Sequence, residues 1–188
     1  MIHEQMSIEN NVTLAIRDEA FNIIETHHKR NRVTNLALYG IAKLIFGSFT
    51  NINELSDYIP KYIAFGTGGE TPKADDTSLE AEITDSENNP VRIPITQRNI
   101  VNTNLENGVV KVVYRAYTAS TVFNGPTLNE MGLFVEDTGD NLFARVGLQS
   151  IVTERGKVLD ILWEINIRST TTGGVSEEET EQDGEQEE

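Results

Sequence analysis

The residues best suited to chemistry lie in the stretch 61–83, where a short apolar run, Ile63 to Phe65, gives way to glycines and then to acidic residues. Glycines after a buried strand often begin a phosphate-binding loop. A P-loop, however, ends in Gly-Lys-Ser/Thr, and a dinucleotide fingerprint needs G-x-G-x-x-G before a helix. Residues 66–72, GTGGETP, match neither pattern, so we exclude a nucleotide site. The glycines are expected to serve a sharp turn by taking φ values closed to other residues.

Carboxylates and histidines are the remaining candidates for chemistry. Asp75, Asp76 and Glu80 could hold a hard cation, but the EF-hand spacing is missing, and turn formation is the favoured role. His27 and His28 are adjacent on an expected helix, so they do not share the face that two metal ligands need. The chain has no cysteine, which excludes disulfides and thiolate sites. We expect no metal, no cofactor and no catalytic residue.

Charge and composition narrow the class of partner. The 188 residues suffice for one domain, and the formal net charge is −15. Eight acidic residues lie between Glu177 and Glu188, which leaves about −7 on the rest and disfavours nucleic acid. No run of about 18 apolar residues indicates a membrane span, and the first residues lack the features of a secretory signal. The tail 171–188 is expected to be disordered, either solubilising the protein or docking on a basic surface of a partner.

The first sixty residues read as helical. Val12, Ile16, Ala20, Ile23 and Ile24 recur at helical spacing and predict an amphipathic helix from about Val12 to His28. A second apolar pattern predicts a helix over about Asn35–Phe46, with Thr34 as its N-cap. Residues 48–60 are expected to form a loop.

The apolar run at 62–65 predicts a short buried strand, and from Leu79 onward the pattern is that of β-strands. The pair Asn107-Gly108 predicts a hairpin between 98–104 and 109–118, because this dipeptide suits a type I′ turn. The strands expected besides this hairpin are 62–65, 79–83, 91–95, 128–136, 142–151 and 158–168. The predicted fold class is α+β: an antiparallel β-sandwich of about seven strands at 61–170, preceded by a helical segment at 1–60 packed on the sheet and followed by the acidic tail 171–188.

Three stretches together carry a family resemblance: FGTG at 65–68, DDTSLEAEI at 75–83 and LNEMGLFVEDTGDNLFARV at 128–146. Their order resembles the N-terminal module of tail-collar fibre and baseplate-associated proteins of tailed bacteriophages, in which an apolar strand, G-x-G and an acidic loop precede an E-x-G-L-F hairpin. The residues at the hairpin positions are Glu130, Gly132, Leu133, Phe134, Gly139, Leu142 and Ala144. The similarity spans about residues 33–168, although the fibrous repeats of such proteins do not follow here.

This resemblance implies a structural component of the virion, assembled in the host cytoplasm. It would be an adaptor or ring-forming protein at the tail, baseplate, neck or capsid surface, acting through contacts with its own copies and with other virion proteins. The candidate assembly contacts are Asp75, Asp76, Glu130 and Phe134.

Two other classes stay open at this point. A receptor- or carbohydrate-binding sandwich of the tail would expose aromatic side chains on its loops, and Tyr58, Tyr62, Tyr117 and Phe123 are the candidates. An enzyme with paired carboxylates, for instance a hydrolase of the tail, would need two acids held in one cleft, whereas the acids here fall mostly in turns.

Overall fold

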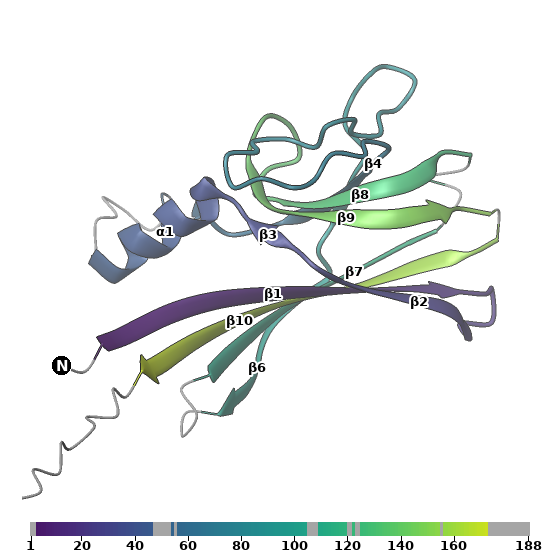
Figure 1. Ribbon diagram of the computed structural model, residues 1–188. Coiled ribbons are helices and arrows are strands. Elements are labelled where there is room, and N and C mark those ends of the chain that lie inside the picture. The colour runs from purple at the N-terminus through teal and green to yellow at the C-terminus, as the bar shows by residue number, and fades with distance from the viewer. Residues whose placement is uncertain are drawn as a thin grey trace, which may run out of the picture.

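The computed structural model describes residues 3–46, 54, 56–104, 109–119, 122, 125–154 and 156–172 (Figure 1). Within these residues it contains ten strands and one α-helix. In chain order the elements are β1 (His3–Arg17), β2 (Ile23–Arg30), β3 (Arg32–Val33), α1 (Asn35–Phe46), β4 (Tyr62–Gly66), β5 (Arg92–Pro94), β6 (Gln97–Asn104), β7 (Val109–Ala119), β8 (Thr127–Phe134), β9 (Leu142–Val152) and β10 (Val158–Thr172).

The strands form two five-stranded antiparallel sheets. Sheet A has the order β2-β1-β10-β7-β6, and sheet B has the order β3-β9-β8-β4-β5. The two lie one above the other in Figure 1 and share one hydrophobic core. This β-rich arrangement fits the predicted antiparallel sandwich, with more strands and fewer helices than expected.

The prediction of a first helix over 12–28 is wrong. These residues form the last part of β1, the turn after it and most of β2, and the two strands pair as an antiparallel hairpin. The helical spacing of Val12 and Ile16 coincides with a period of two, since Val12, Leu14 and Ile16 all point into the core. Asp18 closes the turn by accepting a hydrogen bond from the backbone amide of Asn22 at 2.8 Å. Residues 12–28 are therefore part of the sandwich and do not form a helix packed on its sheet.

The long strands β1 and β10 supply the centre of the core. They pair along their whole length, from His3 opposite Thr172 to Arg17 opposite Val158. Trp163 of β10 is completely buried and lies opposite Val12 on one side and Tyr114 of β7 on the other. Burial of such cross-strand apolar pairs is the main favourable contribution to sheet stability.

The segment β2–β3 closes one side of the sandwich by passing from one sheet to the other. Arg30 of β2 pairs with Asn11 in sheet A, whereas Arg32 of β3 pairs with Arg145 in sheet B. The chain then enters α1, so the second predicted helix is confirmed. The hydroxyl of Thr34, the expected N-cap, instead donates to the carbonyl of Leu142 at 2.6 Å, while its own carbonyl accepts from the amide of Leu38.

The predicted hairpin 98–118 is confirmed by the pairing of β6 with β7, and β8 pairs with β9 as expected. The strand expected at 79–83 is reduced to an isolated bridge between Gly66 and Glu82.

The predicted acidic tail begins later than expected, because residues 171 and 172 belong to β10. Its remaining residues, 173–188, and residues 48–53 and 55 of the predicted loop 48–60 lie outside the described residues. No helix within the described part of the chain is long and apolar enough to cross a membrane.

Candidate functional site

Glu130 is the centre of the stretch that the sequence singled out. It stands on β8 with its residue only 1% exposed. One carboxylate oxygen, Oε1, accepts hydrogen bonds from the backbone amides of Gly68 at 3.1 Å and Ala81 at 2.8 Å. The other, Oε2, accepts from the amide of Glu80 at 3.2 Å. A single buried carboxylate therefore joins the two halves of the sequence signature, the glycine loop and the β8–β9 hairpin.

Arg145 of β9 supplies the opposite charge. Its Nε and Nη2 both lie 2.8 Å from Glu130 Oε2, and its Nη1 lies 2.9 Å from Asp76 Oδ2. Burial alone would lower the pKa of Arg145, but the hydrogen bond to Asp76 and the charge of Glu130 raise it above the ordinary arginine value. The guanidinium stays charged and holds the acidic loop against the sheet. We call Arg145, Glu130, Asp76 and Glu80 the Arg145 cluster.

The glycines of the loop make room for this carboxylate. A Cβ added to Gly68 would lie 2.6 Å from Glu130 Oε1, and one added to Gly66 would also collide with Glu130. Neither glycine has a positive φ, a property confined among the described glycines to Gly125, Gly139 and Gly156. The expected reason for the glycines, a special φ, is therefore wrong for Gly66 and Gly68, and close approach of the side chain replaces it.

Phe134, the last residue of β8, is also buried. The guanidinium carbon of Arg92 lies 3.6 Å from the centre of its ring. Arg92 also forms two hydrogen bonds to Glu82, at 2.8 and 3.0 Å, and donates to the carbonyls of Glu136 and Gly139. Arg92 thereby fastens β5 to the turn between β8 and β9.

The four predicted contact residues thus have different positions. Glu130 and Phe134 are interior, and their side chains serve the fold of their own chain, which corrects the prediction that they contact a neighbouring subunit. Asp76 is half-buried; it accepts from the amide of Lys73 at 2.8 Å, as expected of a turn residue, and pairs with Arg145. Asp75 is exposed and remains a predicted contact. Within the described residues no group of three His, Cys, Asp or Glu side chains is arranged to hold a metal ion.

Sequence reasoning missed the arginines. The sequence motifs point to neither Arg145 nor Arg92, although each arginine stands in an otherwise largely apolar strand. A charged residue at such a position must find a partner when it is buried, which is a usable signal. The sequence does not reveal the partners of these arginines. Asp76 is far from Arg145 along the chain, and Glu82, the partner of Arg92, lies outside the regular strands.

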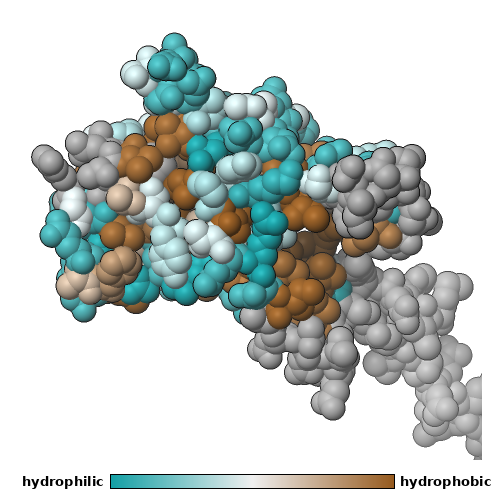
Figure 2. Space-filling model, turned by 180° about the vertical axis from the view of Figure 1, so that it is seen from behind, coloured by the Kyte–Doolittle hydropathy of each residue, from teal (hydrophilic) through white to brown (hydrophobic). Residues whose placement is uncertain are grey.

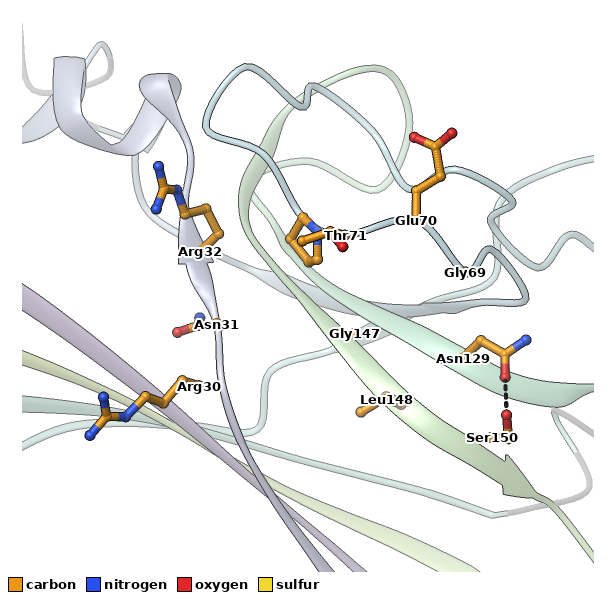
Figure 3. A pocket seen from close by; sticks show the side chains of 11 residues that line it. Arg30, Asn31, Arg32, Gly69, Glu70, Thr71, Asn129, Gly147, Leu148 and Ser150 are labelled. Carbon is orange, nitrogen blue, oxygen red and sulfur yellow. Dashed lines mark hydrogen bonds between the residues drawn. The ribbon is translucent and has the colours of Figure 1, made fainter.

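An open groove of about 620 Å³ lies beside the Arg145 cluster (Figure 3). Loop residues 69–72 form one wall, the segment Arg30–Arg32 forms the opposite wall, and Gly147 and Leu148 of β9 lie between them. Asn129 is fixed there by a hydrogen bond from the hydroxyl of Ser150 at 3.0 Å. The groove combines two exposed arginines with backbone and amide groups, which suits an extended polar or acidic segment.

The aromatic residues expected of a carbohydrate site do not gather at this groove. Tyr58 packs edge-to-face on Tyr39 of α1, and Tyr117 of β7 lies 4.7 Å from the guanidinium of Arg115. Tyr62 is half-buried in β4, and Phe123 lies outside the described residues.

A second surface lies at the end of sheet A where β10 finishes. Register places Ile8, Ile167 and Val110 in one row across three strands, and Val112 and Ile100 in the row beside it. Ile8, Val110, Val112 and Ile167 are half-buried, and Ile100 on the edge strand β6 is 70% exposed. We call these five residues the apolar end of sheet A. Figure 2 shows hydrophobic side chains gathered around a hollow on this side of the molecule.

Comparisons of the chain with protein-family models, with curated proteins and with solved structures found no match.

Proposed function

We propose that the protein is a structural component of a tailed-bacteriophage particle that works by binding copies of itself and other virion proteins. The observation that carries the proposal is the apolar end of sheet A. Five aliphatic residues from four adjacent strands form one continuous surface, and it ends at an edge strand. Continuous apolar surfaces beside a free strand edge are typical of protein interfaces.

The occupant that fits this surface is a second copy of the chain. The backbone of β6 pairs with β7 on one side only, so its other edge is free to form a ladder with an equivalent strand. Ile100, the most exposed of the large apolar residues described, would be covered by such pairing. A twofold contact of this kind buries the same patch on both copies.

The Arg145 cluster supports the same proposal in a different way. It fixes the loop 66–81 on sheet B through a buried carboxylate, and the loop carries the exposed Asp75. A loop held in one conformation loses little entropy when a partner binds it. The residues of the phage-like signature would therefore act by presenting a rigid surface and would carry out no reaction.

The first test is self-association. Wild-type protein is expected to form oligomers in light scattering coupled to size-exclusion chromatography, and Ile100→Glu is expected to shift them towards monomer. Val152→Glu is the matched control, because Val152 is 64% exposed on β9 of the other sheet. A wild-type chain that stays monomeric at its highest soluble concentration, or equal effects of the two substitutions, would contradict the proposed interface.

The second test concerns the particle. Mass spectrometry of purified virions is expected to find the chain in fixed stoichiometry, and cross-links are expected between its residues near β6 and another copy. Absence of the chain from intact particles would overturn the virion assignment even if it self-associates.

A further inference from the structure

Two arginines on the β2–β3 segment form a basic rim on the groove. Arg30 and Arg32 are both exposed, and neither has a carboxylate partner within the described part of the chain. Arg17, Arg92, Arg115, Arg145 and Arg168, by contrast, all form ion pairs. In Figure 3 both rim side chains extend from the segment on the side that faces away from the loop 69–72.

The charge of the rim is unusual for this chain. Arg30 and Arg32 flank a single residue, Asn31, and Lys29 precedes them, in a protein of net charge −15. Glu70, the acidic residue on the facing loop, is already paired with Lys73 at 3.4 Å. Two guanidiniums at one site attract carboxylates and can each form a bidentate pair with one.

The strongest negative charge in the molecule is its own C-terminal segment, with eight acidic residues between Glu177 and Glu188. Its reach can be judged from the sheet register. Arg30 lies opposite Asn11, and Asn11 lies opposite Glu164, which is eight residues before Thr172. At about 3.3 Å per residue and about 4.8 Å per strand, Arg30 lies roughly 28 Å from Thr172.

An extended chain covers about 3.3 Å per residue, so about nine residues after Thr172 span this distance. The first residue able to reach Arg30 is then Glu181, and Glu181–Glu188 contains five acidic residues. We infer that this segment binds in the same molecule to the basic rim of Arg30 and Arg32. The interaction is electrostatic, and it places an acidic strap beside the loop of the Arg145 cluster.

Nuclear magnetic resonance of the full chain tests this directly. The spectrum of the wild-type protein is compared with that of a full-length variant whose eight C-terminal acids are replaced by the matching amides. Amide shifts are expected to change at 30–32, 69–71 and 147–150 and to be independent of protein concentration. They are expected to vanish in 1 M NaCl, where the Debye length is about 3 Å.

Substitution identifies the rim. Arg30→Glu with Arg32→Glu is expected to remove these shift differences, whereas Arg98→Glu, an exposed arginine on β6, is expected to keep them. A peptide of sequence 176–188, titrated into the amide-tailed chain, is expected to bind about tenfold more weakly to the doubly substituted chain.

Three results would overturn the inference. Shift differences that lie elsewhere on the protein would show a different site, and equal peptide affinity for the Arg30/Arg32 and Arg98 variants would show that the rim is not the receptor. Shift differences that grow with protein concentration would show that the segment binds a second copy rather than its own chain. Loss of self-association in the Ile100 variant leaves this test unaffected, because β2 with Arg30 and β6 with Ile100 lie at opposite edges of sheet A.

Discussion

At the scale of single residues, the buried carboxylate of Glu130 and the guanidinium of Arg145 together hold the acidic loop on sheet B. Glu130 belongs to the hairpin pattern of the family resemblance and Asp76 to the acidic loop, and both form ion pairs with Arg145. Their role as internal ties depends on Arg145, which faces them only once β8 and β9 have paired. A partner that is distant in the sequence leaves no local signal. The sequence alone therefore could not distinguish a contact between subunits from an ion pair within the chain.

Removing the Glu130 carboxylate tests this internal role. Glu130→Ala leaves the guanidinium of Arg145 and three backbone amides without their acceptor in a buried site, so we expect a loss of about 3–5 kcal/mol in the free energy of unfolding. Urea denaturation measures this loss, and hydrogen exchange at Gly68 and Ala81 is expected to accelerate. Glu136→Ala, which removes an exposed partner of Lys61, is the control and should cost about 0–1 kcal/mol. Equal losses in the two variants would contradict the cluster's structural role.

Asp76 makes the fold sensitive to acid. Burial would raise its pKa, but the backbone hydrogen bond from Lys73 and the bond from Arg145 outweigh it and hold the pKa below the ordinary value of 3.8. Because the folded chain holds this proton less tightly than the unfolded chain, the stabilisation is complete above pH 3.8 and disappears as the pH falls through the folded pKa. The stability gap between wild type and Asp76→Asn should therefore be constant above this pH and shrink below it.

Denaturation curves at a series of acidic pH values measure that gap. Asp75→Asn, at the exposed neighbour, is the control and is expected to change stability at neutral pH by less than about 0.5 kcal/mol. A gap that already closes near neutral pH would show that another group carries the dependence.

At the scale of elements, strand prediction succeeded where the alternation was unambiguous. The hairpin of β6 and β7, the pair β8–β9 and β10 all follow from alternating apolar residues between turn residues. The first helix failed because Val12 and Ile16 satisfy both a helical and a strand period. Pairing with β10, nearly 150 residues away in the sequence, decides between them, and a local pattern carries no information about that pairing.

The loop of the Arg145 cluster offers a prediction about how closely two elements approach. Gly68→Ala would place a Cβ 2.5 Å from Glu80 Cβ and 2.6 Å from Glu130 Oε1, so the loop must shift, at a cost of about 1–3 kcal/mol. Gly69→Ala meets nothing within 4 Å and has no positive φ, so we expect a change of less than about 0.5 kcal/mol. Thermal unfolding of the two variants compares them under identical conditions. A destabilised Gly69 variant with a stable Gly68 variant would show that backbone freedom, and not space, selects these glycines.

At the scale of the whole molecule, the first and the last of the described strands meet in one sheet. β1 lies between β2 and β10, so the first described strand pairs directly with the last. The sequence pattern predicts a boundary at about residue 60 between a helical N-terminal segment and the β-sandwich. With β1 as an inner strand of sheet A, residues 1–60 and 61–170 share their core and cannot fold as separate layers.

This topology predicts that neither part folds alone. A fragment starting at residue 61 lacks β1, and with it the cover that Val12, Leu14 and Ile16 give to β10. The burial of these three aliphatic side chains contributes about 5–9 kcal/mol, which is comparable with the roughly 5–15 kcal/mol by which domains are stable. Because the fragment also loses the hydrogen-bonded ladder between β1 and β10, it is expected to have no cooperative unfolding transition. Trp163, the only tryptophan, reports on this directly, because its fluorescence should be that of an exposed indole in the fragment and of a buried one in the full chain. Mixing the two fragments should restore the buried signal if β1 supplies the missing strand. A fragment 61–172 that unfolds cooperatively with a buried Trp163 would show instead that β1 is an addition to a sandwich already complete without it.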